Sequence, residues 1–300
     1  MTGITENKNY DYFSLKKTVG ALQEKYPFIH TSVIGKSVAG RDITAIKIGR
    51  ANEYVLFAAA FHGSEHITST LMLKFTEELC EKLQNGGEIA GINVKNVMHG
   101  RAIIIIPCVN PDGVEICMHG ALSAGSMAHS VARIARGDTE HWNANLRGVD
   151  LNHNFDADWE NLHKLEQESG IYGPALTRYG GTKPFSEPET VALAELCRTM
   201  KIRHALAFHS QGEVIYWDYN GFNPPRSRKM AEILATSSGY ALDYPTGLAV
   251  GGGFKDWFIK EFNRPAFTIE VGLGENPLPI DQSENIYKNI REMLILSVAM

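Results

Sequence analysis

The sequence predicts an α/β fold in a single domain, with a mixed but mostly parallel central sheet flanked by helices. Strand-like and helix-like segments alternate along all 300 residues. Short, continuous apolar runs at residues 54–60 and 102–107 are typical of strands that are buried on both faces. Residues 67–83 instead carry apolar side chains at intervals of four, as an amphipathic helix does. This alternation indicates one sheet with helices packed on it.

The remaining elements are predicted from the same two periodicities. Alternating apolar and polar residues at 31–34 and 42–48 indicate a hairpin. Ser186-Glu187-Pro188-Glu189 has the pattern of a capping box that opens a helix, and Asn110-Pro111-Asp112-Gly113 has the composition of a turn. Further helices are expected at residues 10–24, 190–200, 226–238, 254–261 and 284–299, and further strands at 202–208, 214–218 and 266–271.

Residues 121–179 have weak periodicity and are expected to form a long, loop-rich segment, which in a compact domain is usually functional. No internal repeat, linker or low-complexity segment interrupts the chain. We therefore expect one domain that covers residues 1–300.

Composition argues against several classes of partner. The net charge is −5 and no run is rich in Lys or Arg, so nucleic acid and anionic membranes are not expected partners. No apolar stretch approaches the ~20 residues of a membrane span, and the first seven residues lack a signal-peptide pattern. The scattered cysteines form no CxxC and are expected to be reduced core thiols: Cys80, Cys108, Cys117 and Cys197. A cytoplasmic location is expected, and export by an unusual route stays open.

Polar side chains stand at the ends of three apolar runs. His62 and Glu65 follow the run 54–60, His209 follows 202–208, and Glu270 lies in 266–271. Open α/β sheets place their sites at the carboxyl edge, so we expect these side chains to meet there. Two histidines and one glutamate are a donor set of catalytic zinc, which keeps a fourth position for water. The sequence therefore predicts one Zn²⁺ held by His62, Glu65 and His209.

A second interpretation of the same residues is the inverted zinc-peptidase motif HxxEH. His62-Gly63-Ser64-Glu65-His66 matches it, with both histidines as ligands and Glu65 as the base. That motif needs a continuous helix through all five residues. Gly63-Ser64 instead looks like a turn, with the helix beginning near Ile67, so His66 is expected to be structural or to support the ligands.

With these residues identified, the chain resembles the zinc carboxypeptidase family (carboxypeptidase A type, peptidase M14). The family's signature pieces occur in order: His62-x-x-Glu65, Asn110-Pro111-Asp112-Gly113, Gly148-Val149-Asp150-Leu151-Asn152, His209, Asp256-Trp257 and Glu270. The resemblance implies the family's fold, zinc-dependent amide hydrolysis, and Glu270 as the general base that activates water.

Within the family the chain looks most similar to the bacterial branch that cleaves the γ-D-glutamyl–diaminopimelate bond of peptidoglycan peptides. The residues behind this similarity are Trp142-x-Ala144-Asn145, His209-Ser210-Gln211-Gly212-Glu213-x-Ile215-Tyr216-Trp217, Lys255-Asp256-Trp257-Phe258-Ile259 and Arg264-Pro265-x-Phe267-Thr268-x-Glu270. It implies a peptide or muropeptide substrate. The wall-binding repeats of better known secreted members are not expected here, and the sequence gives no oligomeric state.

The chain departs from ordinary carboxypeptidases where these bind a C-terminal carboxylate. Asn152-His153 replaces the family's Asn-Arg, and an imidazole does not replace a bidentate guanidinium. The family's oxyanion-stabilising arginine aligns with Asn143, and its mobile tyrosine aligns near Leu248. The resemblance thus implies an altered substrate, with contacts from Asn152, His153, Asn143, Arg147 and Gln211. Asp150 is expected either to hold the Asn152 turn or to orient a metal-binding histidine.

Two other functions remain open from the sequence. One is a carboxypeptidase or amidase that acts on other acidic or acylated amino acids. The other is a non-enzymatic metal-binding member of the family. The complete ligand set together with Glu270 favours an enzyme.

Overall fold

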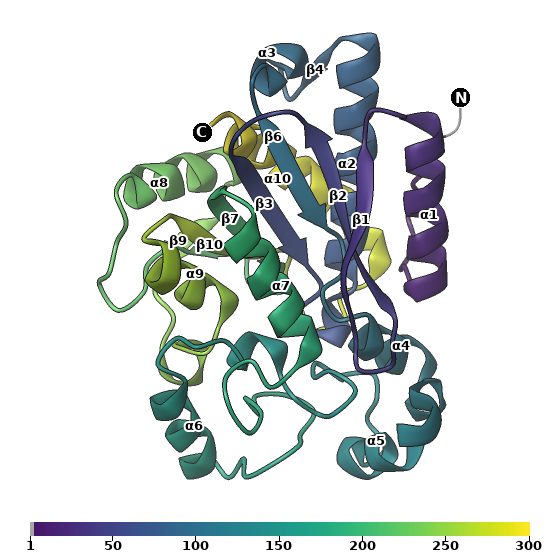
Figure 1. The fold of residues 1–300 in the computed structure, drawn as a ribbon, viewed down its shortest axis with the longest axis vertical. Coiled ribbons are helices and arrows are strands. Elements are labelled where there is room, and N and C mark those ends of the chain that lie inside the picture. Colours follow the sequence, from purple (N-terminus) through teal and green to yellow (C-terminus); the bar gives the residue numbers. More distant parts are fainter. Residues whose placement is uncertain (1–2) are drawn as a thin grey trace.

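The computed structural model of the protein describes residues 3–300, which fold around an eight-stranded mixed sheet (Figure 1). The strand order is β1-β2-β6-β3-β7-β10-β8-β9. The strands are β1 (His30–Lys36), β2 (Asp42–Gly49), β3 (Tyr54–Ala59), β6 (Ala102–Ile106), β7 (Ile202–His209), β8 (Val214–Tyr216), β9 (Ala241–Asp243) and β10 (Ala266–Glu270). A separate small hairpin pairs β4 (Glu88–Ile89) with β5 (Ile92–Asn93).

The centre of the large sheet is parallel, antiparallel pairs flank it on both sides, and the edge strand β9 pairs parallel with β8. Strands β6, β3, β7 and β10 run in one direction. β2 pairs antiparallel with β6 and with β1, and β8 pairs antiparallel with β10. The chain moves from β3 to β6 on one side and later to β7 on the other. The strand order therefore reverses beside β3, and such a switch point is where open α/β sheets form their sites.

Helices cover both faces of the sheet. Figure 1 shows α7 and α9 in front of the sheet, with α2 and α10 behind it. The helices are α1 (Tyr12–Lys25), α2 (Ile67–Asn85), α3 (Val94–Met98), α4 (Pro111–His119), α5 (Ala128–Ala135), α6 (Trp159–Glu168), α7 (Pro188–Thr199), α8 (Ser227–Ser238), α9 (Phe254–Phe262) and α10 (Ser283–Ala299). The segment 121–179 lies beyond the carboxyl ends of the parallel strands (Figure 1).

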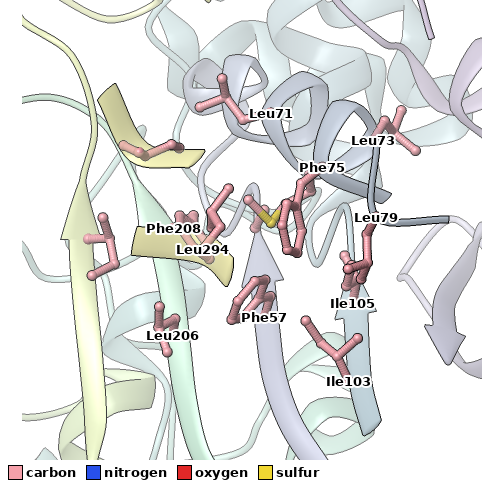
Figure 2. Packing of buried hydrophobic residues seen from close by; sticks show 14 of the residues in the cluster. Phe57, Leu71, Leu73, Phe75, Leu79, Ile103, Ile105, Leu206, Phe208 and Leu294 are labelled. Carbon is pink, nitrogen blue, oxygen red and sulfur yellow. The ribbon is translucent and has the colours of Figure 1, made fainter. Parts of the chain in front are cut away.

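Alternating side chains of the central strands feed two separate cores. Phe57 and Ile105 point to the face covered by α2 and α10, where they pack with Phe75 and Leu294 (Figure 2). The next residues along the same strands, such as Leu56, belong to the core under α7 and α9. Because both faces are covered, a continuous apolar run is required in each central strand, and this confirms the predicted fold class.

Three local expectations were wrong or incomplete. Residues 110–113 do not form an isolated turn: Asn110 caps α4, with its Oδ1 accepting from the backbone N–H of Gly113 at 2.9 Å. Helix α7 begins at Pro188 with Glu187 at the cap position, and the Ser186 hydroxyl instead donates to Oε1 of Glu187 at 2.9 Å. The short strand β9 was not predicted, because its three residues contain no apolar run.

The four cysteines are free thiols, as expected. Three of them are buried, whereas Cys117 is half-buried rather than a core residue. Among residues 3–300, no helix is both long enough and apolar enough to cross a bilayer.

Candidate metal centre and active-site cavity

The turn after β3 brings His62 and Glu65 to the carboxyl edge of the sheet. β3 ends at Ala59, and Ala60 adopts a left-handed conformation with φ 50°. A 3-10 helix then covers Gly63–Glu65, and α2 begins at Ile67 as predicted. A Cβ on Gly63 would lie 2.3 Å from the carbonyl oxygen of Gly113. This turn can therefore pack against α4 only when position 63 is glycine.

His209 and Glu270 reach the same edge from two neighbouring strands. They are the last residues of β7 and β10, and they stand opposite each other in the parallel register. The His209 ring stacks on Phe61, with 5.0 Å between ring centroids, and this contact fixes its orientation. The fold thus assembles the predicted group from three chain segments.

The three predicted ligands lie together. One donor atom from each of His62, Glu65 and His209 falls within a group no wider than 4.8 Å. Nδ1 of His62 is 2.9 Å from Oε1 of Glu65, and Nδ1 of His209 is 3.0 Å from Oε2 of Glu65. His66 is not in this group, and the 3-10 helix ends there before α2 begins. The continuous helix required by the inverted HxxEH motif is therefore absent.

The donor set fits a catalytic zinc ion. Nδ1 of His62 is buried and makes no hydrogen bond, although a carboxylate oxygen of Glu65 lies close to it. Nδ1 of His209 faces the other carboxylate oxygen of Glu65 and lies 3.0 Å from Oε2. An unpaired buried nitrogen is costly, so an Nδ1 of His62 without a hydrogen bond, beside a carboxylate that also faces His209, is expected where the three side chains face a common cation. Two imidazoles and one carboxylate are a zinc donor set.

Asp150 supports His62 from the other side. Nε2 of His62 lies 3.0 Å from Oδ1 of Asp150, a fully buried carboxylate. When a carboxylate accepts a hydrogen bond from Nε2–H of a neutral imidazole, Nδ1 keeps its lone pair free to bind a metal ion. Such a carboxylate is the usual support of a metal-binding histidine. Oδ1 of Asp150 also accepts from the backbone N–H of Asn152 at 3.1 Å. The contacts on which both expected roles of Asp150 depend are thus present.

Opposite charges stabilise the buried ligand group. Burial alone would raise the pKa of Glu65, but His62 and His209 outweigh it and lower the pKa to about 2. Burial alone would likewise lower the pKa of His62, but the Glu65 and Asp150 carboxylates raise it well above its ordinary value. Without a bound cation, the site therefore favours a carboxylate beside a protonated imidazole, and a divalent cation would take the place of that proton.

The surroundings of Glu270 raise the pKa of its carboxyl group, whereas those of Glu65 lower it. Burial, and then the negative charge of Glu65, raise its pKa well above the ordinary value, and only His62 opposes them. A carboxylate with this environment binds a proton readily, which is the property that a general base and acid needs.

These residues open into a cavity of about 390 Å³, a volume within the usual range of ligand pockets. The predicted residues His62, His209, Glu270, Asn152 and His153 all line it. Oδ1 of Asn152 accepts from the backbone N–H of Phe254 at 3.0 Å, and Nδ1 of His153 lies 2.8 Å from Oε1 of Glu166. Leu248, which aligns with the family's mobile tyrosine, lies on the cavity wall.

The other three predicted contacts lie outside this cavity. Asn143 accepts a hydrogen bond from the hydroxyl of Ser64, which lies in the turn between His62 and Glu65. Arg147 pairs with Glu187, with 3.4 Å between Nη1 and Oε2, and lines a neighbouring groove. Gln211 is exposed and is not among the cavity residues. Roles for these three in substrate binding stay predictions.

Sequence reasoning missed three charged residues of the cavity lining. Lys255 and Asp256 are buried, form an ion pair and line the cavity. Both stand in the motif Lys255-Asp256-Trp257, so their position could have been anticipated. Arg178 also lines the cavity, but it lies in the segment 121–179, where no periodicity indicated which side chains face inward.

Comparison with known proteins agrees with this geometry. A family model described as Peptidase_M14, zinc carboxypeptidase, matches residues 15–293. Gamma-D-glutamyl-L-diamino acid endopeptidase 1 of Lysinibacillus sphaericus is 35% identical over 288 residues, which cover 95% of this chain and 71% of that protein. The carboxypeptidase A structure from Helicoverpa armigera superposes with a TM-score of 0.74 at 20% identity, over 98% of this chain and 74% of that one.

A second solved structure, the murein-tripeptide amidase MpaA from Escherichia coli O157, has a TM-score of 0.53 at 22% identity, over 90% of this chain and 89% of that one. At these identities the two structures support the fold. The fold and the donor set define a zinc metallopeptidase. The chain belongs to the zinc carboxypeptidase family, peptidase M14.

Proposed function

We propose that this zinc metallopeptidase hydrolyses the γ-D-glutamyl–diaminopimelate amide bond of peptidoglycan peptides. The observation that carries the proposal is the set His62, Glu65, His209 and Glu270 at one edge of the sheet, in a chain that is 35% identical to a protein named for γ-D-glutamyl–diamino acid cleavage. His62, Glu65 and His209 are the proposed zinc ligands.

The proposed chemistry divides between the cation and Glu270. A zinc ion, when bound, lowers the pKa of a coordinated water to about 7 and polarises a carbonyl group. The carboxylate of Glu270 takes the proton from the attacking water. Its raised proton affinity favours that uptake, and the same carboxyl group then gives the proton to the leaving amine. Asp150 holds His62 in orientation throughout.

The buried end of the cavity supports a diaminopimelate leaving group. Lys255, Asp256 and His153 are all less than one-tenth exposed there. A cation, a carboxylate and an imidazole together match a side chain that carries both an ammonium and a carboxylate group. Glu166, which is completely buried, accepts from His153 at 2.8 Å and keeps that ring in place.

The discriminating experiment offers two substrates to the zinc-loaded enzyme: L-Ala-γ-D-Glu-diaminopimelate and an ordinary C-terminal dipeptide. We expect release of diaminopimelate from the first and little cleavage of the second, with loss of activity after chelation and recovery on adding zinc. Cleavage of the dipeptide alone would contradict the proposed substrate and favour a carboxypeptidase for other amino acids. No cleavage of either, with zinc bound, would favour the non-enzymatic alternative.

A further inference from the structure

The cavity has a buried end and an open end. Lys255, Asp256 and His153 form the buried end, whereas Arg178 and Thr246 are exposed at the rim. If the leaving amino acid occupies the buried end, the acyl part of the substrate has to leave through the open one. The rim residues are therefore placed to contact the residue on the acyl side of the scissile bond.

Arg178 is anchored to the metal centre through its backbone. Its N–H donates to Oδ2 of Asp150 at 2.8 Å, and the neighbouring Thr177 hydroxyl donates to the same oxygen at 3.2 Å. Asp150 in turn contacts His62. The rim of the cavity is thus fixed relative to the proposed zinc ligands by one shared carboxylate, even though the Arg178 side chain is exposed.

The Arg178 guanidinium is the unpaired cation of the cavity. Lys255, the other cationic chain in the lining, is neutralised by Asp256. Within residues 3–300 the Arg178 side chain makes no hydrogen bond or ion pair, while Arg147 nearby already pairs with Glu187. A planar guanidinium without a partner suits bidentate binding of a carboxylate.

The open end continues into a basic groove. Thr177 and Arg178 line both the cavity and this groove, and three further arginines line the groove beyond them: Arg133, Arg136 and Arg147. No aspartate or glutamate is present in its described lining. The path away from the metal centre therefore favours an acyl portion with negative charge.

A γ-linked glutamyl residue on the acyl side of the scissile bond carries a negative charge. Its α-carboxylate is free, and two methylene groups separate the α-carbon from the scissile carbonyl carbon. In an ordinary peptide the acyl residue has no such free carboxylate. We propose, on the basis of the proposed function, that Arg178 binds the α-carboxylate of the γ-linked glutamate and so selects isopeptide over ordinary peptide bonds.

The test compares L-Ala-γ-D-Glu-diaminopimelate with its isoglutamine analogue, in which that α-carboxylate is an amide. The zinc-loaded wild-type enzyme should prefer the carboxylate substrate by about tenfold in kcat/KM, a modest factor because the rim is open to water. The Arg178→Gln substitution should remove this preference, because it should lower kcat/KM for the carboxylate substrate and leave that for the amide analogue unchanged. Calorimetric binding of the product L-Ala-D-Glu against L-Ala-D-isoglutamine should show the same loss.

Arg50→Gln is the matched control, because Arg50 is exposed and lines neither the cavity nor the groove. It should leave the preference intact. Equal effects of Arg178→Gln on both substrates, or a wild-type enzyme that cleaves both equally well, would overturn the role of Arg178 while the proposed function stands. A wild-type enzyme that cleaves neither substrate would overturn both proposals.

Discussion

Asp150 links the proposed metal ligands to the rim of the cavity, and its removal is therefore a sensitive test of the site. With Asp150→Asn, Oδ1 of the amide can still accept from His62, but the negative charge that stabilises the ligand group is lost. We expect zinc affinity, measured by competition with a chelator, to fall about tenfold to hundredfold. Asp156→Asn, at an exposed position nearby, should leave the affinity unchanged. Equal affinities for all three proteins would show that Asp150 does not support the metal.

Glu189 makes stability depend on pH away from the metal centre. Burial raises its pKa from 4.5 to about 7, despite hydrogen bonds from the backbone N–H of Val38 at 3.1 Å and from Asn145 at 3.2 Å. The folded state therefore keeps a proton that the unfolded chain loses as the pH rises. The free energy of unfolding should fall by about 3 kcal/mol between pH 4.5 and 7, and the loss should persist above pH 7.

Urea titrations across this range should show that fall in the wild type and a flatter profile in Glu189→Gln. Glu195→Gln, at an exposed position of the same helix, is the control and should follow the wild-type profile. Because the metal affects all three proteins alike, differences between their profiles isolate Glu189. If the free energy of unfolding of the wild type rose between pH 5 and 7 relative to that of Glu189→Gln, the raised pKa of Glu189 would be contradicted.

The residues proposed to carry the chemistry were predictable because recognisable apolar runs precede them. His62, His209 and Glu270 stand at strand ends, and the HxxE spacing identifies Glu65. Their partners were less predictable. Glu166, which holds His153, lies on α6 within the segment 121–179, where no helix was predicted.

At the scale of elements, the turn between β3 and α2 depends on the absence of a side chain at Gly63. Gly63→Ala would place a methyl group 2.3 Å from the Gly113 carbonyl oxygen and 2.4 Å from that of Trp142. We expect the turn to shift, with a loss of stability of about 1–3 kcal/mol and a lower zinc content after dialysis.

Gly20→Ala makes the same chemical change in the middle of α1, where nothing lies within 4 Å of the new Cβ. It should stabilise the protein by about 0.5–1 kcal/mol, because alanine favours the helix. Thermal unfolding and metal analysis of both variants provide the comparison. If Gly63→Ala retained wild-type stability and zinc, the turn would not be constrained as the contacts with α4 indicate.

Periodicity identified most helices and strands but not all of them. Helix α4 was mistaken for a turn because Pro, Asp and Gly follow Asn110, although Asn at the cap with Pro at the first helical position also starts helices. The strand β9 has exposed or half-exposed residues, so it lacks the apolar signal that identified β3, β6 and β7. Its pairing with β8 is a tertiary contact that a local pattern cannot predict.

At the scale of the whole molecule, the strand order determines the site. β3, β7 and β10 are neighbours in the sheet although long stretches of chain separate them, and their carboxyl ends bring the proposed ligands and Glu270 together. The sequence indicated an α/β domain, but the order of eight strands depends on which pairs form across the sheet. No local pattern in this chain determines those pairs.

The most direct test of the account measures zinc content and substrate cleavage together in three proteins. The wild type should retain one zinc ion after dialysis and release diaminopimelate from L-Ala-γ-D-Glu-diaminopimelate. Glu270→Gln should retain the zinc but cleave about a thousandfold more slowly, because proton transfer is lost. His209→Ala should lose both zinc and activity. Wild-type cleavage by Glu270→Gln, or zinc retention by His209→Ala as tight as in the wild type, would contradict the assignment of ligands and base.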